Sequence, residues 1–112
     1  MAQQEDCPFC QIARGEMDTE FVHEEEHLVA FEDLDPQAPV HILVIPRDHV
    51  TSETDLPPET LKQLIDATQT IAQKQGIAER GYATRINHGQ NAGQQVDHLH
   101  IHVVGGRELG FP

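Results

Sequence analysis

The chain has 112 residues and a formal net charge of −12, from 19 acidic and 7 basic side chains. This length suits one domain covering residues 1–112, and the acidic balance argues against nucleic acid or an anionic membrane as the main partner, because each requires a clustered basic surface. With two cysteines, no charged-then-apolar leader and no apolar stretch long enough to span a bilayer, we expect a cytoplasmic protein without a disulfide framework.

The N-terminal part predicts one helix and one hairpin. Residues 1–6 are polar and are expected to fray. Residues 8–15 predict a short helix, with proline early and glycine as its stop. Two strands are predicted at residues 20–23 and 27–32, joined across the acidic turn 24–26.

The middle of the chain predicts a central strand and one long helix. A loop at residues 33–39 leads into an apolar strand at residues 40–45 that ends at a proline. Residues 58–75 predict the helix, because apolar side chains recur on one helical face. That face carries Leu61, Leu64, Ile65, Thr68, Ile71 and Ala72. Thr54 or Asp55 is a candidate N-cap, and Gly76 is the expected stop.

The C-terminal part predicts a further interior strand at residues 82–86, a polar loop at residues 87–94 and a last strand at residues 98–104. Two glycines end this last strand. The order of helices and strands indicates an α+β domain with an antiparallel sheet.

Three histidines, His98, His100 and His102, alternate with apolar residues in the last strand. Alternate side chains of a strand point to opposite faces, so we expect the imidazoles on one solvated, titratable face. The first and third Cα atoms would lie roughly 13 Å apart, too far to share one metal ion. Histidine has a pKa of about 6.5, so its neutral and protonated forms are both accessible near neutral pH. The pattern favours chemistry by the imidazoles themselves over a solvated face with no chemical role.

The loop at residues 88–95 offers glycines, amide side chains and many backbone N–H donors, which can hold a phosphate without lysine or arginine. An ordinary tight connection has the same composition. Next to the histidines, the loop indicates phosphoryl or nucleotidyl transfer, with local donors offsetting the overall negative charge.

Cys7 and Cys10 form a Cys-x-x-Cys pair, which is half of a tetrahedral zinc site. Two reduced thiols in a short helix are one alternative. A redox-active pair is another, although the βαβ setting of thioredoxin-like chemistry is absent.

The histidine pattern, residues 31–41, residues 43–49 and the loop at residues 87–94 together resemble the histidine triad (HIT) superfamily, and within it the histidine triad nucleotide-binding branch. The resemblance covers nearly the whole chain. It implies a HIT-like fold, with an antiparallel sheet of about five strands, one long helix and one short N-terminal helix. It also implies a hydrolase that cleaves the P–N bond of AMP- or GMP-amine conjugates through a covalent nucleotidyl-histidine. Asparagine at position 87 favours this activity over dinucleoside polyphosphate hydrolysis, which is the alternative together with a nucleotide-binding interaction module of little turnover.

Site residues follow from the same resemblance. It implies that His100 is the nucleophile, that His102 contacts the phosphate and assists the leaving group, and that His41 lies close to the nucleophile; His98 completes the catalytic set. The implied nucleotide-binding residues are Asp33 and Leu34 at the ribose, Phe9, Ile12, Met17 and Phe31 around the purine, and Asn87, Gly93, Gln94 and Gln95 at the phosphate. Gln95 and Phe111 depart from the family, which has serine and tryptophan there, so the phosphate contact and the choice of leaving group are left open.

Some bacterial-type members resemble this chain in a further set of ligands. Their pattern implies a structural zinc held by Cys7, Cys10, His49 and His98, while catalysis itself needs no cofactor. The resemblance also implies a homodimer formed through the long helix and a strand edge.

Overall fold

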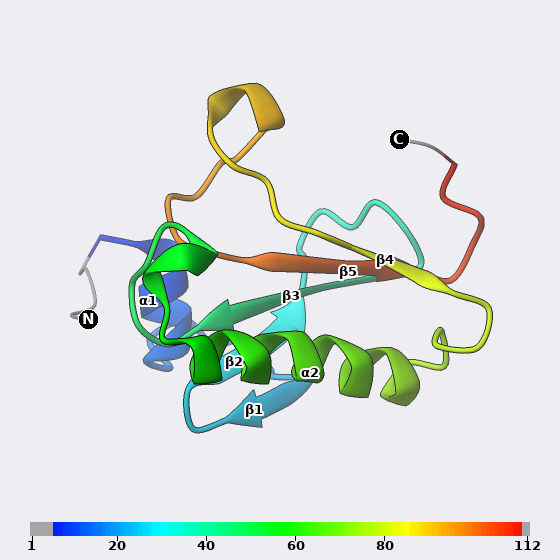
Figure 1. Ribbon diagram of the computed structural model, residues 1–112, viewed down its shortest axis with the longest axis horizontal. Coiled ribbons are helices and arrows are strands. Elements are labelled where there is room, and N and C mark those ends of the chain that lie inside the picture. Colours follow the sequence, from blue (N-terminus) through cyan, green and yellow to red (C-terminus); the bar gives the residue numbers. More distant parts are fainter. Residues whose placement is uncertain (1–5, 111–112) are drawn as a thin grey trace.

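A five-stranded antiparallel sheet forms the centre of the molecule, in a computed structural model that describes residues 6–110. The strands lie in the order β1-β2-β3-β5-β4, so β3 is central as predicted. In chain order the elements are α1 (Pro8–Ala13), β1 (His23–Glu25), β2 (Leu28–Glu32), β3 (Val40–Pro46), the 3-10 helix η1 (Glu53–Asp55), α2 (Pro58–Lys74), β4 (Tyr82–Arg85), the 3-10 helix η2 (Gln90–Ala92) and β5 (Ile101–Gly105). The predicted α+β architecture with one long and one short helix is confirmed (Figure 1). The expected fraying of residues 1–6 falls, except for Asp6, outside the described residues.

Each face of the sheet has its own hydrophobic core. Val44 of β3 packs in one core with Leu64 of α2, and Leu43 packs in the other with Phe9 of α1. Neighbouring residues of a strand point to opposite faces, so the two helices cover opposite sides of the sheet. Figure 1 shows α2 lying along one of these sides.

The apolar face of α2 agrees with its prediction at Leu64, Thr68, Ile71 and Ala72, which are all buried. The prediction for Ile65 is wrong, because this residue lies at the margin of the packed face and is 44% exposed. Neither α2 nor any other helix in the described part of the chain has the length and apolar character needed to cross a membrane.

The two ends of α2 compare differently with the prediction. Thr54 and Asp55 do not cap it, because they lie in η1, whose own cap is Ser52. The helix begins after Pro57 without a side-chain cap, and the proline in its first turn lacks an N–H that would need one. At the other end Gly76 has φ of +74°, a conformation that glycine adopts readily, and the helix stops there as predicted.

The first hairpin is tighter than predicted. β1 occupies residues 23–25 rather than 20–23, and Glu25 pairs with Leu28 across a two-residue turn. Glu24 and Glu25 therefore belong to the strand, with their side chains in solvent, and are not part of the turn.

The last two strands also differ from their predictions. β4 is an edge strand, largely exposed, and not an interior one. β5 begins at Ile101, not at His98. The residues just before β5 bond to a loop instead of a strand, as in the 2.7 Å hydrogen bond from the N–H of Leu99 to the carbonyl of Val50.

Candidate functional site

The histidine segment places three imidazoles on the side of the sheet that carries α1. The apolar residues between them are buried on the α2 side, as the predicted alternation requires. The prediction that the imidazoles lie in solvent is wrong, since His98 has no exposed surface, His100 is 8% exposed and His102 is partly buried. Helix α1 covers two of the three imidazoles, because Phe9 packs edge-on against the rings of both His98 and His100.

His100 has one ring nitrogen engaged and the other open. Its Nδ1–H donates to the carbonyl oxygen of His98 at 2.7 Å, so the lone pair lies on Nε2. No described group bonds to Nε2, and no buried side-chain nitrogen or oxygen in residues 6–110 lacks a partner, so Nε2 keeps contact with solvent. The geometry suits a neutral imidazole that attacks through Nε2.

A chain of hydrogen bonds fixes the protons of His41 and His102. The backbone N–H of Gln37 donates to Nδ1 of His41 at 3.0 Å, so His41 carries its proton on Nε2. This Nε2–H donates to Nδ1 of His102 at 2.8 Å. Oδ2 of Asp33 lies 3.4 Å from Nε2 of His41. His102 is left with its proton on Nε2, where it can donate to a ligand.

Burial keeps these histidines neutral near pH 7. It lowers the pKa of His98 and that of His102 from the ordinary 6.5 to about 4. For His102, the neighbouring histidines and Arg85 lower the pKa further, while Asp33 raises it. Burial also lowers the pKa of His41, and the Asp33 carboxylate opposes that change.

The residues that the resemblance implies for the purine differ in exposure. Phe9 and Phe31 are buried, with ring centroids 5.8 Å apart in an edge contact. Ile12 packs against the same core. Met17 and Leu34 are 46% and 101% exposed and lie outside that core.

The loop before β5 bonds largely to itself. Asn87 Nδ2 donates to the carbonyl of Ala92 at 2.8 Å, and the N–H of Gly89 donates to Oε1 of Gln94 at 2.7 Å. The N–H groups of Gly93 and Gln94 also bond within the loop. The prediction of many free backbone donors is therefore wrong at these positions. Asn87 and Gln94 hold the shape of the loop.

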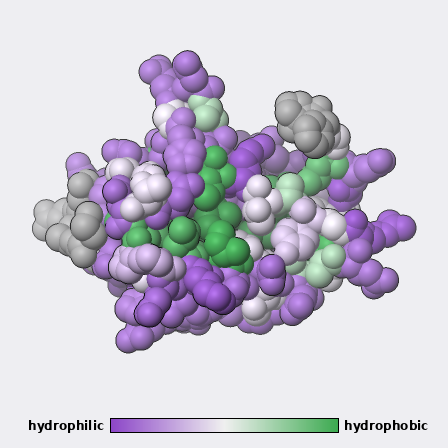
Figure 2. All heavy atoms as spheres, in the orientation of Figure 1, coloured by the Kyte–Doolittle hydropathy of each residue, from purple (hydrophilic) through white to green (hydrophobic). Residues whose placement is uncertain are grey.

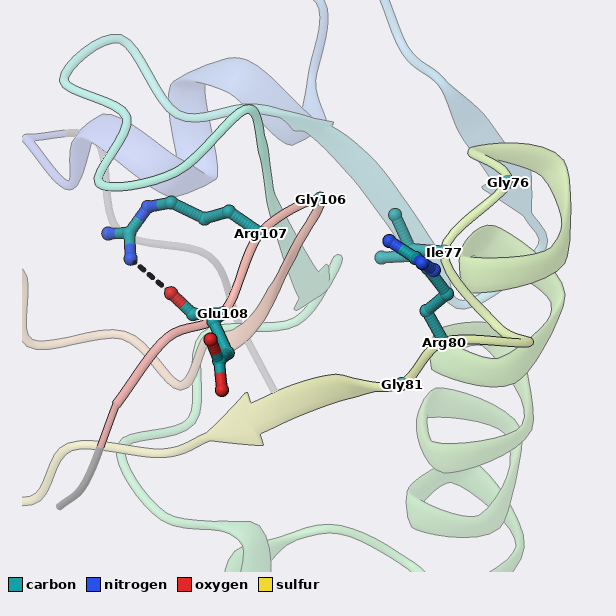
Figure 3. A pocket seen from close by; sticks show the side chains of 7 residues that line it. All are labelled: Gly76, Ile77, Arg80, Gly81, Gly106, Arg107 and Glu108. Atoms are coloured by element: carbon teal, nitrogen blue, oxygen red, sulfur yellow. Dashed lines mark hydrogen bonds between the residues drawn. The ribbon is translucent and has the colours of Figure 1, made fainter.

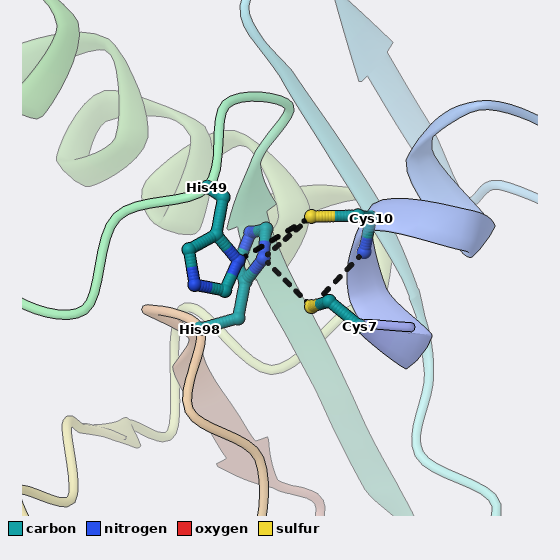
Figure 4. A group of neighbouring side chains, drawn as sticks. All are labelled: Cys7, Cys10, His49 and His98. Carbon is teal, nitrogen blue, oxygen red and sulfur yellow. Dashed lines mark hydrogen bonds between the residues drawn. The ribbon is translucent and has the colours of Figure 1, made fainter. Parts of the chain in front are cut away.

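Cys7, Cys10, His49 and His98 lie together and are all buried, with their ligand atoms within 4.8 Å of one another (Figure 4). Cys7 Sγ is 3.3 Å from His98 Nδ1, and Cys10 Sγ is 3.4 Å from His49 Nδ1 and 3.5 Å from His98 Nδ1. Ligands on a tetrahedral zinc are about 3.6 Å apart for a sulfur and a nitrogen. His98 Nε2–H donates to the carbonyl of Pro46 at 3.0 Å, which directs the Nδ1 lone pair at the sulfurs. These four residues fit a metal ion.

A second group, Asp33, His41 and His102, has ligand atoms equally close together. Its geometry suits proton sharing better than coordination. The two ring nitrogens are 2.8 Å apart, whereas two nitrogens on one tetrahedral ion lie roughly 3.3 Å apart.

Sequence reasoning missed three groups at this site. The backbone N–H of Gln37 and the carbonyl of Pro46 set the tautomers of His41 and His98, and main-chain partners of this kind leave no mark in a residue pattern. Arg85 was missed because only the strand register, which pairs it with His102, brings it to the site. Of the two departures from the family, Gln95 is exposed and Phe111 lies outside the described residues.

Comparison of the sequence with known proteins gives one family and several relatives. The model of the HIT domain family matches residues 14–109. A purine nucleoside phosphoramidase from Escherichia coli strain K12 is 38% identical over 109 residues, which cover 95% of this chain and 92% of that protein. An uncharacterized HIT-like protein from Synechococcus elongatus is 43% identical over 111 residues, which cover 96% of each.

Solved structures share the fold. A HIT family hydrolase from Clostridium thermocellum superposes with a TM-score of 0.92 at 36% identity, over 98% of both chains. A histidine triad nucleotide-binding protein from Candida albicans superposes with a TM-score of 0.84 at 28% identity, over 96% of this chain and 83% of that one.

Proposed function

The chain belongs to the HIT domain family, and from that premise we propose that it hydrolyses purine nucleoside phosphoramidates, cleaving the P–N bond between AMP or GMP and an amine. The observation that carries the proposal is the proton pattern of the two neighbouring histidines. His100 offers a lone pair at Nε2, and His102 offers a proton at Nε2. Their ring centroids are 5.1 Å apart, so one group could contact both rings.

The reaction proceeds in two halves. Nε2 of His100 bonds to phosphorus and the P–N bond breaks, leaving its electron pair on the departing nitrogen. That nitrogen takes the Nε2 proton of His102 and leaves as an amine. In the second half water bonds to phosphorus, the bond from phosphorus to His100 breaks, and a proton of the water replaces the one that His102 gave. The products are an amine and a nucleoside monophosphate.

His41 and Asp33 support this exchange. The Nε2–H of His41 is bonded to His102, and it stabilises the negative charge that develops on the His102 ring as its proton departs. Asp33 is half-buried beside His41, and its carboxylate can accept hydrogen bonds from the ribose hydroxyls. Phe9, Phe31 and the exposed Leu34 would contact the nucleoside.

His100→Asn is the sharpest test of the proposed function. The asparagine amide keeps a donor where Nδ1–H meets the carbonyl of His98, but it has no nucleophilic nitrogen. We expect cleavage of adenosine phosphoramidate to fall by at least about a thousandfold, while AMP still binds. A variant that keeps its activity would contradict the role of His100. Faster cleavage of diadenosine tetraphosphate than of the phosphoramidate by the wild type would favour the dinucleotide hydrolase instead.

We further propose that the metal held by the two cysteines, His49 and His98 is zinc. All four ligand types suit this ion, and the N–H of Cys10 donates to Cys7 Sγ at the start of α1, which holds that sulfur in place. When bound, zinc would hold α1 against the histidine segment and would supply no group to the reaction. Neither Cys7 nor Cys10 forms a disulfide, which supports a cytoplasmic location.

We also propose a homodimer formed through α2 and β4. The outer edge of β4 has no partner strand in the described sheet, and such an edge is open to pairing. Ile65 of α2 is 44% exposed, and Figure 2 shows hydrophobic residues gathered between α2 and the loop that carries η2. Sedimentation would show the dimer, and Ile65→Lys would weaken it. A wild type that sediments as a monomer at micromolar concentration would contradict this assembly.

A further inference from the structure

A groove of about 530 Å³ runs beside β4 and the end of β5. Its walls include Arg80, Arg85, Arg107 and Glu108. A neighbouring hollow of about 400 Å³ shares all of these charged residues except Arg85. In Figure 3, Arg80 projects from the turn before β4, and Arg107 from the segment after β5.

The groove adjoins the reacting histidines. Arg85 pairs in register with His102, so the two side chains leave the same face of the sheet. Val104, which lines the groove, lies two residues beyond His102 along β5, on the side away from His100. The groove therefore continues the row of histidines past His102. Pairing of a second copy along the edge of β4 would leave this face accessible, because side chains project from the face of a sheet and not from its edge.

Positive charge is concentrated in this groove. The groove holds three of the seven basic residues of a chain with net charge −12. Three arginines against one glutamate give a local charge of +2. Such a site attracts anions at short range, where the charges of the rest of the protein are screened.

These arginines are available to a ligand to different degrees. The side chains of Arg80 and Arg85 form no ion pair or hydrogen bond within residues 6–110. Arg107 donates to the carbonyls of Gln37 and Glu108, which anchors one wall of the groove. Arg85 also lowers the pKa of both His41 and His102, so its charge interacts with these two histidines.

We propose that the groove binds a negatively charged group on the departing amine, a carboxylate or a phosphate, with Arg85 joining the groove to His102. The inference rests on the proposed function, and it adds a substrate class to it: nucleoside phosphoramidates of acidic amines. A guanidinium binds either oxyanion through two parallel hydrogen bonds. The acidic protein would otherwise repel such a substrate, and the groove offsets that repulsion where the leaving group emerges.

Matched substrates test the groove. AMP joined to glycine carries a carboxylate, and AMP joined to glycinamide is nearly the same size without that charge. AMP joined to 2-aminoethyl phosphate and AMP joined to ethanolamine form the phosphate pair. We expect the wild type to prefer the charged member of at least one pair by about tenfold in kcat/KM, and the preference to shrink in high salt. The pair that shows it identifies the anion.

Two variants with the same change in charge complete the test. Arg85→Gln should reduce the preference to nearly one, whereas Lys62→Gln, on the exposed side of α2 with Asp66 as its partner, should retain it. Equal rates for charged and neutral substrates in the wild type would overturn the groove while leaving the phosphoramidase in place. If no conjugate is cleaved, the proposed function fails. Calorimetry then measures the affinity for each member of the same pairs, and equal affinities for charged and neutral members would overturn the proposal that the groove binds an anion.

Discussion

Acid should destabilise the metal-free protein through its buried histidines, and His102 gives the cleanest measurement. Its pKa is lowered from 6.5 to about 4 by folding, so between these values the unfolded chain binds a proton that the folded chain refuses. The contribution of His102 to the free energy of unfolding is therefore fully present above pH 6.5, and it is lost as the pH falls toward 4. For one such group the loss is about 2 kcal/mol at pH 5 and about 3 kcal/mol at pH 4.

His102→Asn removes this contribution while an amide group remains near the position of Nδ1, which bonds to His41. We would measure urea unfolding of both proteins in chelator at pH 7.5 and pH 5. The variant should be less stable than the wild type at pH 7.5, and the gap should narrow by about 2 kcal/mol at pH 5. His27→Asn, at a histidine whose side chain is 52% exposed, controls for the general effect of acid and should show no such change. If the difference in unfolding free energy between wild type and His102→Asn is the same at both pH values, the reasoning is refuted.

Two further predictions concern the metal centre and the loop at residues 87–94. Zinc at about 100 times its Kd should stabilise the chelated protein by about 2.7 kcal/mol, or a Tm increase of about 10 °C; Cys10→Ser should abolish the increase, and a Tm that zinc leaves unchanged in the wild type would contradict the site. Asn87→Ala removes the hydrogen bond to Ala92. We therefore expect a loss of about 1 kcal/mol in unfolding free energy and a several-fold higher KM for adenosine phosphoramidate. The control for both measurements is Asn91→Ala, because Asn91 is exposed in the same loop. Identical KM values for these two variants would argue against a role of Asn87 in shaping the phosphate site.

The fold could be predicted largely because hydrophobic periodicity is a local property. The alternation in the histidine segment, the apolar run of β3 and the face of α2 are all visible in short windows of sequence. The start of β5 was not visible in such a window, because the backbone before β5 bonds to the loop at Val50, which is distant in sequence, and not to a strand. The edge position of β4 depends on strand order, which no window contains.

The site was less predictable for the same reason. Its residue types are evident in the chain, but their burial depends on α1, which packs Phe9 over His98 and His100. The alternation of a strand predicts a shared face, and it cannot tell whether water or another helix covers that face. The contribution of Arg85 depends on register with His102, which is fixed by pairing partners distant in sequence.

The protons of the four site histidines are directed mainly by the path of the main chain. Carbonyl groups of Pro46 and His98 and the amide of Gln37 set three of the tautomers, and every amino acid carries a carbonyl at these places. Side chains at positions 37 and 46 can therefore vary without altering which nitrogen is nucleophilic and which is acidic. The exception is proline at position 37, which has no amide hydrogen and would free His41 to reverse its tautomer, so the direction of proton flow through the pair depends on this one N–H.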